Sequence, residues 1–387
     1  MITPSFALTA TERILPRMAL DFTTASLDSR VTFTRSGNTA TVTNSSGLIA
    51  PINADLPRFD FDPTTLVCKG LLIEEARTNL VLQSQAFDQA AWSKSSVTVT
   101  ADAAVSPDGT SNADLITATA ADCVIYQIFA VSIATAYTFS FYAKAAVNTN
   151  ISILIDTSGA GSYVVTPITI TTAWTRFVIP FTTSGVGCIV LIGGSATFSS
   201  PEAFYAYGAQ LEAGAFATSY IPTTASQVTR TADVAVMTST NFSSWYNASE
   251  GAFLASAVTS RQVAIGATAI ISANDTTSAN YLNCFFRAAG SLGANIIAAS
   301  ATQLDQTPLG VTTANTVVNI GVAYKLNNDV SYANGTVQTS VTTATVPTLT
   351  QLQFGISPTG SYLNGWVRSL RYWNQRILNA EGQAFSK

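Results

Sequence analysis

Hydrophobic and polar residues alternate one by one in two segments of the first half of the chain. Residues 137–144 (YTFSFYAK) and 174–181 (WTRFVIPF) each place aromatic or aliphatic side chains at every second position. Side chains of a strand point alternately to its two faces, so both segments are predicted to be strands with one buried face. Pro180 cannot donate a ladder hydrogen bond, which places the second strand at a sheet edge or at a bulge.

Three further short runs of β-branched and aromatic residues are predicted strands. They are residues 151–155 (ISILI), 188–192 (CIVLI) and 203–207 (AFYAY), and turns rich in Gly and Ser lie at 158–162 and 184–187. Many short strands with regular turns are typical of a sandwich or a jelly roll.

A second set of strand signals runs from residue 241 to the C-terminus. Asn334-Gly335 is a strong hairpin turn after residues 330–333. Residues 365–373 (GWVRSLRYW) alternate, which predicts Trp366 and Tyr372 on one face of a strand and Trp373 on the other. The segment 379–385 is predicted to form one short helix with Asn379 as its N-cap.

These patterns predict an all-β fold of two antiparallel β-sandwiches of the jelly-roll type, preceded by a small N-terminal β-rich region. We expect the N-terminal region at residues 1–70, the first sandwich at 71–222, a polar linker at 223–240 and the second sandwich at 241–387. The N-terminal region is too small to hold a core of its own. It is therefore expected to pack on a neighbouring domain or on a partner chain.

Composition narrows the classes of partner. Hydrophobic residues make up 47% of the 387 residues, whereas charged residues make up only 10%, against roughly 25% in an average domain. The net charge is −4 and the basic residues are scattered, so no nucleic acid partner is expected. No apolar run is long enough to span a membrane, and the first ten residues lack signal-peptide features.

The missing histidine limits the possible chemistry. The sequence contains no histidine, which excludes Ser-His-Asp and Cys-His systems and imidazole metal sites. The four cysteines are far apart and are predicted to be free thiols. Carboxylate pairs remain, but Glu74 and Glu75 are adjacent and would point to opposite faces of a strand. No catalytic residue is assigned, and the protein is not expected to be an enzyme.

Three motifs resemble those of tailed-bacteriophage virion proteins. They are residues 70–80 (GLLIEEARTNL), 138–144 (TFSFYAK) followed by 174–176, and 207–223 (YGAQLEAGAFATSYIPT) closing on 229–233. They are similar to the jelly-roll, carbohydrate-binding-module-like domain of phage tail fibres and related surface proteins. The C-terminal part, with its hairpin and its strand-then-helix ending, is similar to the concanavalin A-like or laminin-G-like fold.

This resemblance implies a virion structural protein that binds host cell-surface glycan during adsorption. Residues 1–70 would attach it to other virion proteins, and a homo-oligomer would be expected, with a trimer favoured. It would be located in the virion, after assembly in the bacterial host cytoplasm. Two alternatives stay open: a purely structural capsid decoration or baseplate component without glycan binding, and a polysaccharide depolymerase.

Metal binding is not expected, and neither is a cofactor. Sugar-binding jelly rolls often hold calcium through an acid in a last strand of the form Phe-Tyr-Ile-Asp, but here residues 204–208 read FYAYG. Tyr207 stands near the position of the expected acid. The Asn327-Asn328-Asp329 turn could bind a hard cation, but these residues are ordinary turn formers first.

Carbohydrate-binding candidates are aromatic and basic residues on the polar faces of predicted strands. They are Tyr142, Lys144, Trp174 and Arg176, with Tyr163 in a Gly/Ser turn as a loop candidate. Aromatic rings can stack on the apolar faces of sugars. The alternative is that these rings pack against the N-terminal region or an inter-domain seam, because large aromatics are usually at least partly buried.

Overall fold

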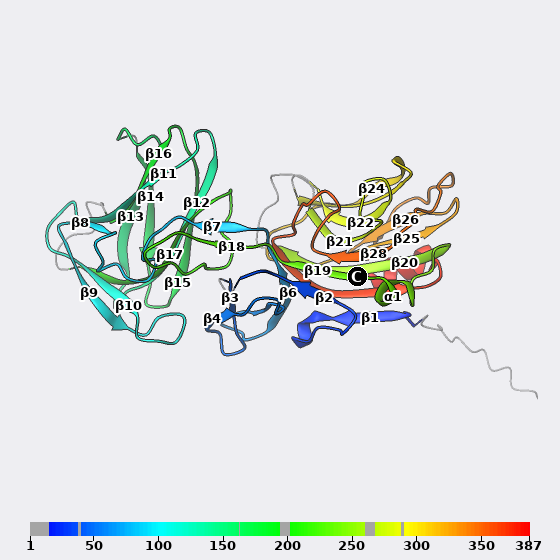
Figure 1. The fold of residues 1–387 in the computed structure, drawn as a ribbon, viewed down its shortest axis with the longest axis horizontal. Coiled ribbons are helices and arrows are strands. Elements are labelled where there is room, and N and C mark those ends of the chain that lie inside the picture. The colour runs from blue at the N-terminus through cyan, green and yellow to red at the C-terminus, as the bar shows by residue number, and fades with distance from the viewer. Residues whose placement is uncertain (1–14, 38–39, 162, 194–201, 260–267, 288–289) are drawn as a thin grey trace, which may run out of the picture.

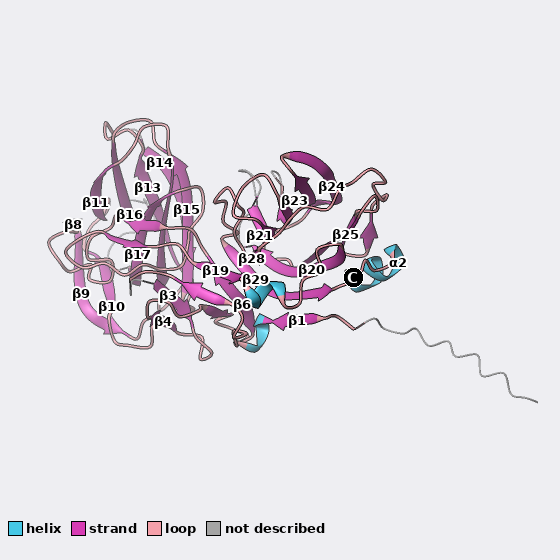
Figure 2. Cartoon of the chain, turned by 45° about the vertical axis from the view of Figure 1, so that its right-hand side comes forward, coloured by secondary structure: helices cyan, strands magenta, loops and turns pink. Residues whose placement is uncertain are grey.

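The computed structural model describes residues 15–37, 40–161, 163–193, 202–259, 268–287 and 290–387. Strands dominate these residues and the helices are short, which confirms the predicted all-β class (Figure 2). Two β-sandwiches lie side by side along the long axis of the molecule (Figure 1).

The first sandwich has a jelly-roll-like architecture of two antiparallel sheets. Sheet 1 has the strand order β15-β12-β17-β10-β9, and sheet 2 has the order β14-β13-β16-β11-β8. The strands are β8 (Ser93–Ser95), β9 (Val97–Ala104), β10 (Ala113–Ala118), β11 (Val124–Ala130), β12 (Ala136–Lys144), β13 (Thr149–Asp156), β14 (Tyr163–Ile170), β15 (Thr175–Thr182), β16 (Gly187–Gly193) and β17 (Ala203–Ala213).

The core of the first sandwich confirms the predicted strand faces. Phe139 and Phe141 of β12 are fully buried and pack with Ile153 of β13 between the two sheets. The strand that contains Pro180 lies at the edge of sheet 1, as its missing N–H predicts.

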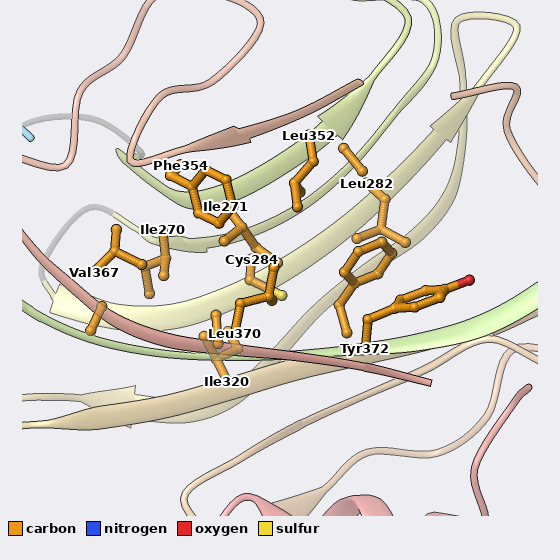
Figure 3. Close-up of a cluster of buried hydrophobic side chains, with 14 of the residues drawn as sticks. Ile270, Ile271, Leu282, Cys284, Ile320, Leu352, Phe354, Val367, Leu370 and Tyr372 are labelled. Atoms are coloured by element: carbon orange, nitrogen blue, oxygen red, sulfur yellow. The ribbon is translucent and has the colours of Figure 1, made fainter. Parts of the chain in front are cut away.

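The second sandwich also has two antiparallel sheets. Sheet 3 has the order β27-β26-β25-β20-β29-β6-β5 with β1 on β29, and sheet 4 has the order β2-β19-β28-β21-β22-β23-β24. The strands are β1 (Met18–Asp21), β2 (Thr32–Thr34), β5 (Phe59–Phe61), β6 (Cys68–Ile73), β19 (Val234–Thr238), β20 (Glu250–Thr259), β21 (Thr268–Asn274), β22 (Tyr281–Phe286), β23 (Ser291–Ala298), β24 (Ala301–Val311), β25 (Val318–Lys325), β26 (Val330–Ala333), β27 (Thr336–Val337), β28 (Gln351–Phe354) and β29 (Gly365–Trp373). Buried side chains of both sheets, such as Ile271, Leu352 and Leu370, meet in its core (Figure 3).

The structure differs from the expected boundaries at both ends of the first sandwich. Strands β1, β5 and β6 extend sheet 3 and β2 extends sheet 4, so the described residues before position 70 do not form a separate region (Figure 1). Within the expected linker, β18 (Val228–Arg230) pairs with β7 (Arg77–Asn79) and β19 lies inside sheet 4. Short strands bury too little apolar area alone and therefore pair with strands from other parts of the chain.

The remaining N-terminal strands form a two-stranded ribbon beside the first sandwich. It consists of β3 (Ala40–Thr43) and β4 (Ile49–Ile52). Short helical turns lie at η1 (Phe22–Thr24) and α1 (Thr240–Ser243). The predicted C-terminal helix is confirmed as α2 (Asn379–Phe385), but its N-cap is Leu378, whose amide donates to Glu381 at 2.7 Å. The predicted cap at Asn379 was therefore wrong by one position.

A β-bulge corrects the predicted faces of β29. Ser369 pairs with Ser256 while Val367 pairs with the next residue, Ala257, so Arg368 is an extra residue in the ladder. The bulge turns Trp366 away from the core that contains Tyr372. The prediction that these two side chains share one face was therefore wrong.

All four cysteines are free and buried, which confirms their predicted state. Burial raises the pKa of the Cys188 thiol to about 12. Among the residues that the structure describes, no helix is long and apolar enough to cross a membrane.

Candidate functional site

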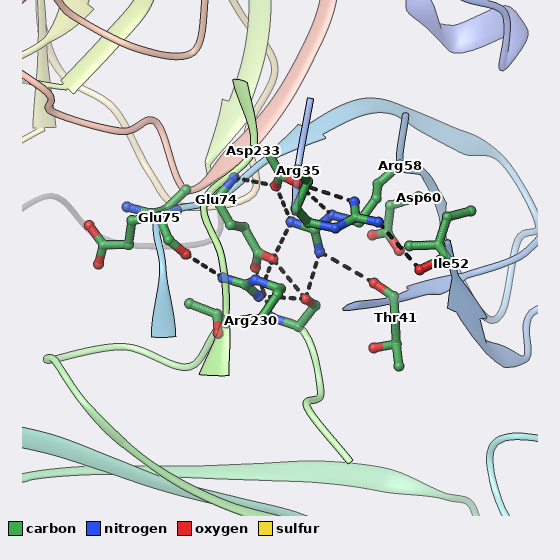
Figure 4. Close-up of polar contacts among 12 residues, drawn as sticks. Arg35, Thr41, Ile52, Arg58, Asp60, Glu74, Glu75, Arg230 and Asp233 are labelled. Carbon is green, nitrogen blue, oxygen red and sulfur yellow. Dashed lines mark hydrogen bonds and ion pairs between the residues drawn. The ribbon is translucent and has the colours of Figure 1, made fainter. Parts of the chain in front are cut away.

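Five ionised side chains form a buried cluster where the two sandwiches meet, which we call the junction cluster: Arg35, Arg58, Glu74, Arg230 and Asp233 (Figure 4). Arg58 forms ion pairs with Glu74, at 2.7 Å, and with Asp233. Arg230 reaches Glu74 at 2.6 Å, and Arg35 reaches Asp233 at 3.4 Å. The Glu74 side chain is 7% exposed and Arg58 is 0% exposed, so water contributes little to their solvation.

Strand ends from distant parts of the chain bring these charges together. Arg58 precedes β5, Glu74 follows β6, Arg230 ends β18 and Asp233 precedes β19. The Glu74 amide donates to the Asp233 carboxylate at 2.9 Å, and the Asp233 amide donates to the Glu74 carbonyl at 3.0 Å. Removing one partner from such a buried pair costs about 3–5 kcal/mol, because it leaves an unpaired charge.

The electrostatics favour the ionised forms of Glu74 and Arg58. Burial raises the pKa of Glu74, but its ion pairs with Arg230 and Arg58 outweigh this effect and lower the pKa to about 2. Ser219 adds hydrogen bonds to Glu74 from its amide and its hydroxyl, at 2.8 and 2.7 Å. Burial lowers the pKa of Arg58, yet Asp233 and Glu74 raise it above its ordinary value. Glu74 therefore carries no proton that it could donate at neutral pH.

Several motif residues behind the resemblance hold this junction together. The Asn79 side chain donates to the Ile221 carbonyl at 2.8 Å, and Gln210 accepts from the Ile221 amide at 2.7 Å. Glu212 accepts from the amide and the hydroxyl of Thr218, at 2.8 and 2.7 Å. The segment 215–223 is thereby fastened to the outer face of sheet 1. These motif residues thus have a structural explanation that requires no ligand.

A cleft of about 900 Å³ lies beside the junction cluster, and we call it the junction cleft. Both sandwiches and the β3–β4 ribbon contribute residues to it. Its aromatic lining consists of Tyr142, Trp174, Phe216, Tyr220 and Trp366. Polar groups between the rings come from Thr43, Asp60, Lys69, Arg176 and Ser219. The volume lies within the range of roughly 300–1,000 Å³ that is typical of small-molecule sites.

The first sandwich supplies one wall of the junction cleft. Tyr142 on β12 and Trp174 just before β15 are both partly exposed. The Arg176 guanidinium lies over the Tyr142 ring, 5.4 Å from its centroid, and the Trp174 indole donates to the Val105 carbonyl at 3.1 Å. Both rings also pack against the cluster around Tyr220. Three of the predicted candidates therefore line one cleft, and two of them, Tyr142 and Trp174, also pack against Tyr220 and the β4 residue Ile49.

The second sandwich supplies the other wall through Trp366. Its indole donates to Asp60 at 3.0 Å, and the Lys69 ammonium lies 4.2 Å above its ring. Lys69 and Asp60 form an ion pair at 2.7 Å. This wall was not predicted, because only the bulge in β29 turns Trp366 out of the core. The pairing of β6 with β29 that brings Lys69 beside it leaves no local pattern in the sequence.

The other two candidates lie at different places. Lys144 is at the end of β12, and its ammonium sits 5.5 Å from the Tyr205 ring centroid and 5.0 Å from that of Trp174, a residue that lines the junction cleft. Tyr163 is 44% exposed and begins β14 in sheet 2, whereas Tyr142 and Arg176 belong to sheet 1. The structure thus brings Lys144 to the candidate site and leaves Tyr163 outside it.

The carboxylates of the junction cleft are committed to neighbouring groups. Asp60 accepts hydrogen bonds from the Trp366 indole and from the Thr43 amide, besides its ion pair with Lys69. Glu74 is held by two arginines and by Ser219. In the described part of the chain, no group of three or more His, Cys, Asp or Glu side chains could hold a metal ion. The aromatic rings and hydroxyl groups remain to contact a ligand.

Comparisons with known proteins give structural similarity only. No family model matches the sequence, and no curated protein matches it. Among solved structures, the CBM40 module of Ruminococcus gnavus IT-sialidase bound to alpha2,3 sialyllactose is 10% identical, with a TM-score of 0.31 over 36% of this chain and 84% of that chain.

Two other solved structures are similar at the same distant level. Domain 4 of AbnA, an extracellular GH43 arabinanase from Geobacillus stearothermophilus in complex with arabinotriose, is 9% identical, with a TM-score of 0.34 over 40% of this chain and 73% of that chain. The enzymatically active domain of bacteriophage CBA120 tailspike protein 4 is 13% identical, with a TM-score of 0.28 over 35% of this chain and 21% of that chain. These similarities concern the architecture of a β-sandwich, and the ligands named belong to those proteins.

Proposed function

We propose that this protein binds glycan in the junction cleft. The observation that carries the proposal is the set of aromatic rings that line one cleft, with polar groups between them: Tyr142, Trp174 and Phe216 are partly exposed on the side of the first sandwich, and Trp366 of the second sandwich is buried in the opposite wall. Aromatic faces cover the apolar C–H surfaces of a sugar, while hydroxyl and charged groups hydrogen-bond its rim. Sites with apolar linings and a few placed polar groups are typical of specific ligand binding.

We also propose that the protein binds without cleaving. Hydrolysis of a glycosidic bond ordinarily needs one carboxylic acid that is protonated and a second carboxylate. Glu74 has a pKa of about 2 and is thus ionised, and Asp60 is paired with Lys69. Incubation with a bound polysaccharide should release no reducing ends, and release that depends on Asp60 or Glu74 would contradict this part of the proposal.

The test is a binding measurement with a matched pair of variants. Trp174→Ala removes a ring from the cleft wall, and Tyr163→Ala removes an exposed ring from sheet 2. On a glycan array and on whole bacterial cells, we expect Trp174→Ala to weaken binding at least tenfold, because buried aromatic anchors dominate interfaces. Tyr163→Ala should bind as the unchanged protein does. Equal glycan binding by the unchanged protein and by both variants would overturn the proposal that the junction cleft is the binding site.

A purely structural role is the second candidate, favoured by the packing of Tyr142 and Trp174 against Tyr220 and the β4 residue Ile49. It predicts that Trp174→Ala lowers the thermal stability of the protein or impairs its assembly, and that no array glycan is bound. Measuring the melting temperature of the variant beside its glycan binding separates the two roles.

We propose a virion surface as the place where binding occurs, on the support of the sequence motifs alone. A phage structural component, with a homotrimer as the favoured oligomer, would present the junction cleft to the host envelope. Locating the protein in intact particles by electron microscopy tests the position, and light scattering on the purified chain tests the trimer. Absence of the protein from particles would contradict the proposed virion location, and a monomer in solution would contradict the proposed trimer.

A further inference from the structure

We infer that the glycan bound in the junction cleft is an anionic one, with a carboxylate or phosphate group held at the Lys144–Arg176 side of the cleft. This inference rests on the proposed function and specifies its ligand class. Its basis is the distribution of paired and unpaired charges around the cleft.

Within the described part of the chain, no carboxylate forms an ion pair with Lys144. Its ammonium contacts the rings of Trp174 and Tyr205 and forms none of the ion pairs within the described residues. Two rings on its flanks hold it in position, since a cation is attracted to an aromatic face. An ammonium has three donors, so this one is available to a ligand at the cleft rim.

Arg176 adds a second positive charge within the cleft lining. Its guanidinium donates to the Thr218 carbonyl at 2.8 Å and to the Ser140 hydroxyl at 3.0 Å, which are both neutral acceptors. Its buried Nε has no hydrogen-bond partner. The charge of Arg176 is therefore solvated but not neutralised, and it favours an anion nearby.

The carboxylates near the cleft do not neutralise the charges of Lys144 and Arg176. Within the described residues, the carboxylates that line the cleft are Asp60 and Glu74, and each is ion-paired to a different cation, Lys69 or the buried arginines. Asp108, behind the lining residue Ser106, is occupied by hydrogen bonds from Ser106, Thr110, Asn112 and Tyr207. Lys144 and Arg176 are thus two cations on this side of the cleft that form none of the ion pairs within the described residues.

The first experiment uses an array of matched glycan pairs with the full chain. Each pair has the same backbone in an anionic and a neutral form: uronate and its methyl ester, sialylated and desialylated, phosphorylated and dephosphorylated. We expect binding to concentrate on the anionic members, and which pairs respond distinguishes carboxylate from phosphate. Equal binding to neutral members would overturn this inference and leave the proposed function standing. No binding to any member would overturn both.

The second experiment is Lys144→Gln, measured by calorimetry on the best-bound anionic member. Loss of one charge-assisted hydrogen bond should weaken binding roughly tenfold, and the difference from the unchanged protein should shrink as salt rises. Lys325→Gln is the matched control, because Lys325 is 50% exposed and pairs with Glu250 on the second sandwich. Equal affinity of the two variants would overturn the inference.

Discussion

Replacing Glu74 by glutamine should destabilise the protein through the junction cluster. Glutamine keeps the size of the side chain but removes the charge that Arg58 and Arg230 share. The folded state lowers the pKa of Glu74 from 4.5 to about 2, which corresponds to about 3 kcal/mol in favour of the folded, ionised form at neutral pH. This expected loss of stability is similar to the cost of removing one partner from a buried ion pair, which is about 3–5 kcal/mol.

The pH dependence follows from the direction of this pKa change. Because the folded pKa lies below the unfolded value, the stabilisation is complete above about pH 4.5 and is lost as the pH falls through about 2. The free energy of unfolding of the unchanged protein should therefore decline across this window. The Glu74→Gln variant should lack this part of the decline.

Urea denaturation followed by tryptophan fluorescence and circular dichroism measures both effects, at pH 7 and pH 3. The matched control is Glu75→Gln, next in the chain, whose side chain is 33% exposed and pairs with Arg77. Because the Glu75 carboxylate stays partly in water, its loss should cost less than that of Glu74. If Glu74→Gln unfolds at the same urea concentration as Glu75→Gln at pH 7, or retains the full acid-dependent decline, the assigned role of the junction cluster is refuted.

Three further predictions concern other parts of the fold. Burial raises the pKa of Asp329 from 3.8 to about 6 and leaves one carboxylate oxygen without a partner, so the folded state loses stability as the pH rises from about 4 through about 6. Asp329→Asn should therefore raise the melting temperature at pH 8, with a gain of about 1–3 kcal/mol, should raise it less at pH 5 and least near pH 3, and a decrease at pH 8 would contradict this. The four buried thiols should resist a thiol reagent such as dithionitrobenzoate in the native state and react in urea; fast native reaction would show that they are accessible. Gly70 has φ +125°, and a Cβ there would lie 2.5 Å from the Val367 carbonyl oxygen. Gly70→Ala should therefore lower the free energy of unfolding by a few kcal/mol and weaken glycan binding by shifting Trp366. An unchanged melting temperature of this variant would refute the tight packing at the bulge.

Local patterns in the sequence determined much of the first sandwich. The alternation at residues 137–144 predicted β12 and its buried face, because the period of two is a property of the extended backbone itself. Pro180 predicted an edge strand, because the lack of a backbone N–H depends on the residue type alone. The same kind of reasoning placed Tyr142, Trp174 and Arg176 on the polar faces of their strands, but only the structure shows that the two strands pair and that the three residues line one cleft.

Only the tertiary structure decided how distant segments combine. The N-terminal strands β1, β2, β5 and β6 join the second sandwich, and the bulge in β29 turns Trp366 towards Lys69. Residues near positions 58, 74 and 230 meet in the junction cluster. Which strands pair across hundreds of residues depends on how much apolar surface each pairing buries. The alternation within one strand does not indicate which other strand it will pair with. For that reason the sequence determined the strands and one wall of the cleft, and the tertiary structure decided the second wall and the charges behind it.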